Sequence, residues 1–321
     1  LADALASLPQ ASASDRESIR RRHRDKEVIQ VFLERLLNDH PETARRLDAL
    51  IAELNESPDS MEALLEDQNY RLAYWRAANQ DLGYRRFFDI NSLVGLRIED
   101  EEVFEESHRL ILEWLREGII RGMRIDHPDG LRDPSAYLGR LRREGPESWI
   151  LVEKILQPDE RLRPDWPVDG ATGYEFTNLL THLLTDSKSR EALTGFYAEF
   201  TGETREYGEV LEEKRLLVID SLFGSDLNRL TSLMLAVCER HRRYRDYTRQ
   251  DIFQALREIL AVFPVYRTYI NADTGWISDH DRRIVTAVIE RSKKNAEVDP
   301  VLLDFLGDIF LLKITGEIES E

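Results

Sequence analysis

Two acidic residues, each at the end of a short apolar run, could together carry out nucleophilic and acid–base chemistry. Asp126 follows the run that begins at Gly122, and Glu153 follows the run that begins at Trp149. In retaining glycoside chemistry one carboxylate attacks the anomeric carbon, and a second, kept protonated, donates its proton to the leaving oxygen about 5 Å away. We therefore take Asp126 as a candidate nucleophile and Glu153 as a candidate acid–base residue. The alternative is that each acid caps a helix or pairs with a basic residue.

The segments around these acids can bring them together. Asp133 can cap a helix between them, Pro134 suits its first turn, and Gly145 can end it. This pattern predicts a strand–helix–strand unit, whose parallel strands place both acids at the sheet edge where barrel enzymes carry their chemistry. Arg124 lies two residues before Asp126, so on a strand both side chains point to one face. A guanidinium there would keep Asp126 ionised and oriented.

The sequence around the acids resembles motifs of one enzyme group. Residues 122–126 resemble the strand-four motif of the α-amylase clan, and residues 152–155 resemble its strand-five motif. A closer resemblance, running in order over about residues 60–285, is to the maltooligosyltrehalose synthases of that clan. The longer segments that carry it are 70–76, 84–97, 124–131, 170–176 and 263–269. Ala171 and Glu175 depart from the family pattern, in which Thr and Asp are expected.

The resemblance implies a fold and an activity. The implied fold class is α/β, a partial (β/α)8 barrel fragment with large, mainly α-helical insertions before strand four and after strand six. The implied reaction is an intramolecular retaining transglycosylation on a maltooligosaccharide substrate, which converts the terminal α-1,4 link to α,α-1,1 and needs no cofactor or metal. Asp126 would be the nucleophile, Glu153 the acid and then the base, and Arg124 the third catalytic residue.

Five further residues are candidates for contact with the substrate. His127 could bind sugar hydroxyls or cap its loop, and Asp129 could instead be a turn residue. Trp75 and Tyr174 lie in the resemblance motifs and could stack on glucose rings, although packing is the alternative for each. Lys154 belongs to the strand-five motif. The aromatic residues for which packing is the better interpretation are Tyr74, Phe87 and Trp166.

Two parts of the clan's site are not identifiable in the sequence, a strand-three motif with a substrate-binding His and a late Asp that stabilises the transition state. His280 and Asp281 imitate the late pair, but Ser278 and Asp281 form a capping-box pattern before an apolar-periodic run. We therefore interpret them as a helix start. We expect the chain to be an internal fragment of a larger enzyme, with the rest of that parent chain as its partner, and to be inactive alone.

Composition narrows the class of protein. The net charge of −17 argues against nucleic acid and anionic membranes as partners, whereas a neutral glucan is indifferent to it. No apolar run approaches the roughly 20 residues that a spanning helix needs. Cys238 is the single cysteine and lies in an apolar run, which predicts a buried side chain and, with the other features, a cytoplasmic location. The basic cluster at residues 20–24 is interpreted as a solvated helix face, with a ligand or partner patch as the alternative.

Periodicity predicts mainly helical ends around a short stretch of strands. The expected helices cover residues 15–37, a segment from Pro41, 61–67, 101–116 and most of the chain after Asn178. The expected strands cover 119–125 and 149–153, with a third near 172–176. The predicted division is a helical insertion at 1–82, the barrel strands with the Asp126/Glu153 site at 83–178, and a helical insertion or subdomain at 179–321.

Two other functions stay open at this point. One is an ordinary α-glucan hydrolase of the same clan. The other is a non-catalytic helical interaction module, against which the intact set of Arg124, Asp126 and Glu153 argues.

Overall fold

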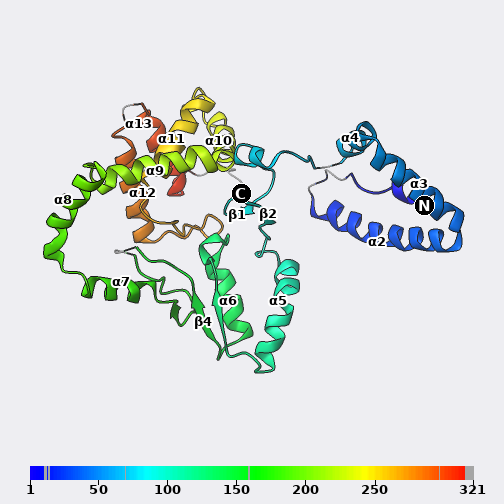
Figure 1. The fold of residues 1–321 in the computed structure, drawn as a ribbon, viewed down its shortest axis with the longest axis horizontal. Helices are drawn as coiled ribbons and strands as arrows, with labels where there is room; N and C mark the ends of the chain where they lie inside the picture. The colour runs from blue at the N-terminus through cyan, green and yellow to red at the C-terminus, as the bar shows by residue number, and fades with distance from the viewer. Residues whose placement is uncertain (11–12, 14, 69, 158–159, 296, 315–321) are drawn as a thin grey trace. The chain divides into compact units, whose positions relative to one another are not determined.

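The computed structural model of the chain describes residues 1–10, 13, 15–68, 70–157, 160–295 and 297–314. The chain forms two compact units, Leu1–Trp75 and Arg76–Glu321, which are described separately. Figure 1 shows the fold and labels many of the helices and strands. The predicted three-part division with a boundary after residue 82 stays a prediction.

The regular secondary structure described in the first unit is entirely helical. Its helices are α1 (Ala2–Ala6), α2 (Arg16–Asp39), α3 (Pro41–Glu56) and α4 (Pro58–Glu66). Asp15 caps α2 by accepting from the Ser18 amide, and Pro41 opens α3 as predicted. Large apolar side chains of α2, such as Val31 and Phe32, remain exposed. The periodicity therefore predicts these helices correctly, although they bury little apolar surface within their own unit.

A three-stranded parallel sheet carries the two acids in the second unit. Its strands, in the order β3-β4-β5, are β3 (Gly122–Ile125), β4 (Trp149–Val152) and β5 (Gly170–Ala171). Helix α6 (Pro134–Glu144) connects β3 to β4, and α5 (Glu101–Arg116) packs beside α6 (Figure 1). Asp133 caps α6 through the Ala136 amide, and Gly145 is its C-cap. The predicted strand–helix–strand unit is confirmed.

The two faces of this sheet differ in their surroundings. Along β4, Ile150 and Val152 are fully buried, whereas Trp149 is 65% exposed. On β3, Arg124 is likewise exposed and lies between the partly buried Met123 and Ile125. We call the side packed on α5 and α6 the covered face and the other side the open face. The core of the covered face is formed by Phe104, Leu112, Leu138, Leu141, Ile150, Val152 and Trp166.

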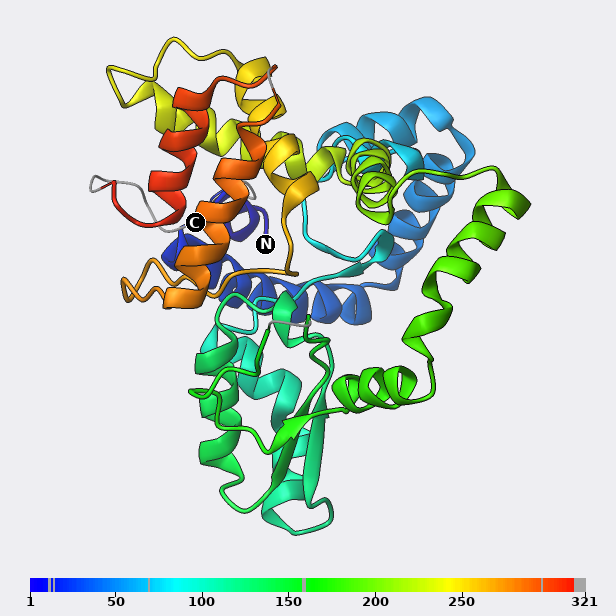
Figure 2. The same cartoon turned by 90° about the vertical axis from the view of Figure 1, so that its left-hand side faces the viewer.

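The rest of the second unit is a hairpin, an arm and a helical bundle. The hairpin pairs β1 (Arg86–Phe87) with β2 (Ile90–Val94) in antiparallel fashion. Figure 2 shows the arm, α7 (Tyr174–Leu183) and α8 (Arg190–Thr201), leading from the sheet to the bundle. The bundle contains α9 (Tyr207–Leu222), α10 (Gly224–Glu239), α11 (Arg249–Val262), α12 (Asp279–Ser292) and α13 (Pro300–Phe310). The short 3-10 helices are η1 (Trp75–Asn79), η2 (Pro128–Gly130) and η3 (Ser187–Ser189).

Burial separates the bundle from the arm. The bundle has its own core, in which Leu302, Leu303 and Phe305 of α13 are at most 1% exposed. Cys238 is free and buried there, as predicted, and burial raises the pKa of its thiol to about 11. No residue of α7 or α8 is buried.

The predicted fold is confirmed in its coarse features. The second unit combines a parallel sheet with many helices, and the described strands are few, short and do not close into a barrel. The third strand was predicted at 172–176, which is wrong. It lies at Gly170–Ala171, because Gly173 takes a left-handed conformation (φ 100°) that ends the extended chain, and Tyr174 begins α7. No helix in the described ranges is long and apolar enough to cross a membrane.

Candidate active site

The parallel register of β3 and β4 brings the two candidate acids together. Ile125 pairs with Val152, and the Glu153 amide donates to the Ile125 carbonyl at 2.8 Å, so Asp126 and Glu153 leave the sheet side by side. Their carboxyl groups share a hydrogen bond. Both continue the alternation that puts Trp149 and Arg124 on the open face. The structure therefore places the two acids as a pair at the carboxyl end of adjacent strands, as the sequence predicts.

The surroundings of Glu153 favour its protonated form. The hydrogen bond with Asp126 raises the pKa of Glu153, and burial and the negative charge of Asp126 raise it further. The guanidinium of Arg124 acts in the opposite direction and lowers this pKa, but the net direction is upward. A carboxyl group that keeps its proton beside a second carboxylate is suited to donate that proton to a leaving group.

Arg124 forms its ion pair with Glu153 and not with Asp126, the predicted partner. Its Nη1 lies 3.1 Å from Oε1 of Glu153, whereas an ion pair with Asp126 was expected. The two side chains share the open face, but the long arginine reaches across to the neighbouring strand. The Arg124 side chain is 70% exposed, so solvent weakens this ion pair.

His127 turns the chain away from β3 and lies within an aromatic cluster. It has a left-handed backbone (φ 48°), and its ring stacks on Phe88 with centroids 5.6 Å apart. Its Nε2 lies 2.7 Å from the hydroxyl of Tyr266. A Cβ at Gly130 would lie only 2.5 Å from Nδ1 of His127, so the turn requires glycine at that position. The ring is thus held by Phe88 and Tyr266, and Asp126 precedes it in the chain.

Asp129 and Lys154 are buried rather than presented to solvent. Nζ of Lys154 lies 3.0 Å from Oδ2 of Asp129, and their side chains are 2% and 9% exposed. A direct contact of either with substrate, as predicted, would require this ion pair to open. Lys154 follows Glu153 in the extended chain beyond β4 and points to the covered face. The contact of both residues with substrate stays a prediction.

The predicted aromatic candidates fall into different environments. Tyr174 is 45% exposed and begins α7, just after the third strand of the sheet. Trp166 is buried against Tyr269, so packing is confirmed as its role. Trp75 is the last residue of the first unit and packs against Tyr74, with centroids 5.7 Å apart. Its contact with substrate stays a prediction.

A segment that the local sequence patterns do not indicate contacts the loop beyond β3. Residues 266–273, here called the strap, lie in the connection between α11 and α12 and against the loop that follows β3. The Tyr269 hydroxyl donates to Oδ1 of Asp129, and Nη1 of Arg267 donates to the carbonyls of Asp129 and Leu131 at 3.0 and 2.6 Å. Part of the strap lies in a resemblance segment, which was the available signal, but no local pattern indicates its partners.

The imitation of a late catalytic pair at residues 280–281 is confirmed as a helix start. Ser278 caps α12 by accepting from the Asp281 amide, and the Asp281 carboxylate accepts from the Tyr269 amide at 3.2 Å. Asp281 is therefore buried beneath the strap. Within the described residues, no group of three or more His, Cys, Asp or Glu is arranged to hold a metal ion.

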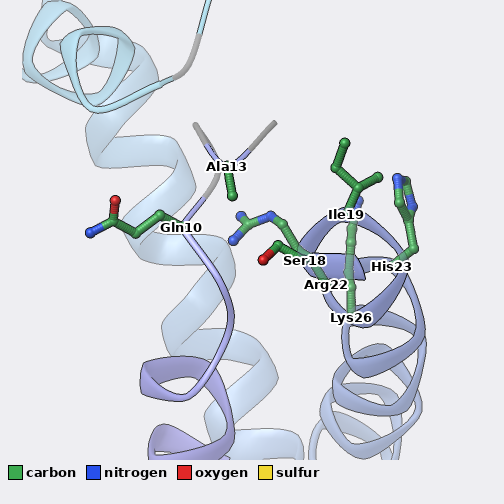
Figure 3. A pocket seen from close by; sticks show the side chains of 7 residues that line it. All are labelled: Gln10, Ala13, Ser18, Ile19, Arg22, His23 and Lys26. Carbon is green, nitrogen blue, oxygen red and sulfur yellow. The ribbon is translucent and has the colours of Figure 1, made fainter. Parts of the chain in front are cut away.

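A separate hollow of about 330 Å³ lies in the first unit, beside the start of α2 (Figure 3). Arg22, His23 and Lys26 contribute to its lining. In the adjoining basic cluster, Arg21 and Arg24 both pair with Asp25, at 3.4 and 3.3 Å. These exposed ion pairs support the interpretation of the cluster as a solvated helix face.

Comparison with known proteins shows what this chain is similar to. No protein-family model matches the chain. A protein of Mycobacterium tuberculosis (strain CDC 1551 / Oshkosh) that carries the name maltooligosyl trehalose synthase is 42% identical over 175 residues, which are 54% of this chain and 23% of that protein. The solved maltooligosyltrehalose synthase of Arthrobacter ramosus is 33% identical with a TM-score of 0.67, and the match covers 78% of this chain and 30% of that one. The chain is similar to part of the maltooligosyltrehalose synthases.

The family resemblance predicted from the motifs is therefore confirmed. The solved hypothetical maltooligosyl trehalose synthase of Sulfolobus tokodaii agrees, with 33% identity and a TM-score of 0.58 over 81% of this chain and 33% of that structure. This chain spans about a quarter of the length of its curated relative and about a third of the solved maltooligosyltrehalose synthases.

Proposed function

We propose that this chain contributes the nucleophile and the acid–base residue of a maltooligosyltrehalose synthase, an isomerase of trehalose biosynthesis. The observation that carries the proposal is the register-matched pair of Asp126 and Glu153, with the pKa of Glu153 raised by its neighbour. The homology to maltooligosyltrehalose synthases supports the same activity. The substrate would be a maltooligosaccharide, whose terminal α-1,4 link becomes α,α-1,1.

The first step forms a covalent intermediate. The Asp126 carboxylate attacks the anomeric carbon of the penultimate glucose, and the bond from that carbon to O4 of the terminal glucose breaks. Glu153 gives its proton to the departing O4, which leaves a neutral glucose and a glycosyl ester on Asp126. The Glu153 carboxylate that results lies beside Arg124, whose positive charge stabilises it.

The second step closes the new link. The freed glucose turns within the site, and Glu153 accepts the proton of its anomeric hydroxyl. That oxygen attacks the anomeric carbon of the glycosyl ester, and the bond from that carbon to the Asp126 oxygen breaks. Two inversions retain the α configuration, and both acids return to their starting states. The reaction therefore needs two neighbouring carboxyl groups with different proton affinity.

Residues around the pair would hold the sugar. His127 can exchange hydrogen bonds with sugar hydroxyls, and the 59%-exposed ring of Phe88 beside it offers an apolar face for a glucose ring. Tyr174 stands at the carboxyl end of the third strand and could contact the same ligand. Trp75 keeps its proposed role as a further stacking residue.

We further propose that β3, β4 and β5 are consecutive strands of a (β/α)8 barrel. The exposed Trp149 and Arg124 on the open face are what an incomplete barrel would leave uncovered. The remaining strands and a transition-state acid would come from a longer protein, so the 321 residues alone should not catalyse the reaction. The three predicted divisions, 1–82, 83–178 and 179–321, fit this arrangement as insertion, barrel strands and insertion.

The test uses a chimaera, in which the matching stretch of this chain replaces its counterpart in the Arthrobacter ramosus enzyme. Incubation with maltopentaose should yield a non-reducing product with the same number of glucose residues. Shorter reducing sugars alone would favour the hydrolase instead. A folded chimaera with neither product would contradict the catalytic role and favour an interaction module.

A further inference from the structure

A buried charge network lies beneath the candidate acids. Lys154 contacts two carboxylates, Asp129 at 3.0 Å and Glu160 at 2.9 Å, and all three side chains are less than a tenth exposed. The hydroxyl of Tyr269 donates to the second oxygen of Asp129. Asp129 therefore connects two segments that are far apart in sequence, the end of β4 and the strap.

Burying such a network stabilises a core less than apolar side chains often would. Removing charges from water is unfavourable, and apolar side chains of similar volume often stabilise a fold as well or better. Its groups are, however, fixed in place, because moving one partner leaves the others buried and unpaired. A network of this kind is thus better suited to setting positions than to adding stability.

The strand geometry connects the network to the acids. Successive side chains on an extended strand point to opposite faces, and burial alternates from Ile150 to Lys154 in this way. Because Lys154 is anchored on the covered face, the adjacent Glu153 must point to the open face. Asp129 follows Asp126 by a single turn that Gly130 closes against the ring of His127. Anchoring Asp129 therefore restricts Asp126.

We propose that Asp129 is a positioning residue, which joins the loop after β3 to Lys154 and the strap and thereby sets the spacing of the Asp126 and Glu153 carboxyl groups. It acts from the opposite face of the sheet and does not touch substrate. The inference deepens the proposed function, since a retaining reaction needs a short and constant separation of the two carboxyl groups.

The experiment measures the consequence of that spacing without measuring turnover. In the 321-residue chain labelled with ¹³C at glutamate carboxyl carbons, the Glu153 signal is assigned by its loss in Glu153→Gln and titrated against pH. Asp126 raises the pKa of Glu153 and Arg124 lowers it, so a looser loop should lower this pKa. Because no catalysis is measured, the network and the proposed function can fail separately.

Tyr269→Phe is the decisive variant because it removes one hydrogen bond to Asp129 and no charge. We expect about a threefold rise in the acid dissociation constant of Glu153. Asp129→Asn should shift it further in the same direction, partly because Lys154 then loses a neutralising partner. Asp273→Asn is the matched control, since Asp273 pairs with Arg132 at 3.1 Å in an exposed bridge between the same loop and strap. It should leave the titration unchanged.

A folded Tyr269→Phe chain with the wild-type titration would overturn the proposal, whether or not Asp129→Asn folds. An equal shift in Asp273→Asn would also overturn it, because any contact between strap and loop would then have the same effect. A shift in Tyr269→Phe with an unchanged control supports it.

Discussion

The two faces of the β3-β4-β5 sheet are built from alternate residues of the same strands and yet have opposite character. On the covered face Ile150 and Val152 are completely buried, and Lys154 is enclosed by carboxylates. On the open face Trp149 and Arg124 meet solvent, and Asp126 and Glu153 form their pair. Each four-residue strand thus contributes alternate side chains to the core, and the residue that follows it contributes to the chemistry. Substitutions on the two faces should therefore separate activity from stability.

The largest expected effect is on the open face. Asp126→Asn in the chimaera removes the nucleophile and should lower turnover of maltopentaose by at least about 10³-fold. The free energy of unfolding of the 321-residue chain, measured in urea, should change by less than about 0.5 kcal/mol because Asp126 is exposed. Near-normal turnover would exclude Asp126 as nucleophile, and a large loss of stability would break the separation of the faces.

Glu153→Gln should slow the reaction of some substrates more than others, depending on whether their leaving group needs a proton. Loss of the proton donor should slow the chimaera on maltopentaose by about 10² to 10⁴-fold. A maltosyl fluoride needs no proton on its leaving group, so mass spectrometry should still detect a glycosyl ester on the enzyme. Equal loss on both substrates would mean that Glu153 has another role.

The covered face should respond in stability instead. Leu138 is fully buried in α6, and Leu138→Ala should reduce the free energy of unfolding by about 2–5 kcal/mol, measured by circular dichroism in urea. Trp149→Ala on the open face is the control. It should reduce the free energy of unfolding of the 321-residue chain by less than about 0.5 kcal/mol. A markedly larger cost of Trp149→Ala in the chimaera would show that further strands cover this face there.

The smallest expected effect concerns the proton affinity of Glu153. The Arg124 guanidinium lowers the pKa of Glu153, so Arg124→Gln should raise that pKa. A general acid works while protonated, and activity is lost as pH rises through its pKa, so the alkaline limb of the chimaera's pH–rate profile should move to higher pH. The dissociation constant should fall only about two- to fivefold, because the ion pair is exposed.

Arg124→Lys provides the comparison, since it keeps the charge and loses the planar fork. The alkaline limb should then move less than in Arg124→Gln. A limb that stays in place in both variants would mean that another group is the acid.

Local signals predicted the parts of the site that local sequence determines. Asp133, Pro134 and Gly145 delimit α6, and strands on either side of it place Asp126 next to Glu153. The partner of Arg124 was wrong because its side chain crosses to a neighbouring strand, and one strand's periodicity carries no information about the reach of a long side chain.

The strap could not be predicted by the same means. Tyr266 and Tyr269 meet His127 and Asp129 across about 140 residues, and no spacing in the sequence encodes that pairing. The extent of the sheet was equally difficult to predict. Apolar runs in the sequence indicate individual strands, but no local pattern gives the number of strands that complete the sheet.

The strap also changes how the sheet and the bundle depend on each other. The chain passes from one to the other through the arm, whose described residues are nowhere buried, so the covalent route transmits little mechanical restraint. Restraint instead passes through Tyr266, Arg267 and Tyr269, which hold the loop beyond β3 from the far end of α11. A protease cut in the arm would therefore leave two chains that remain associated and melt together.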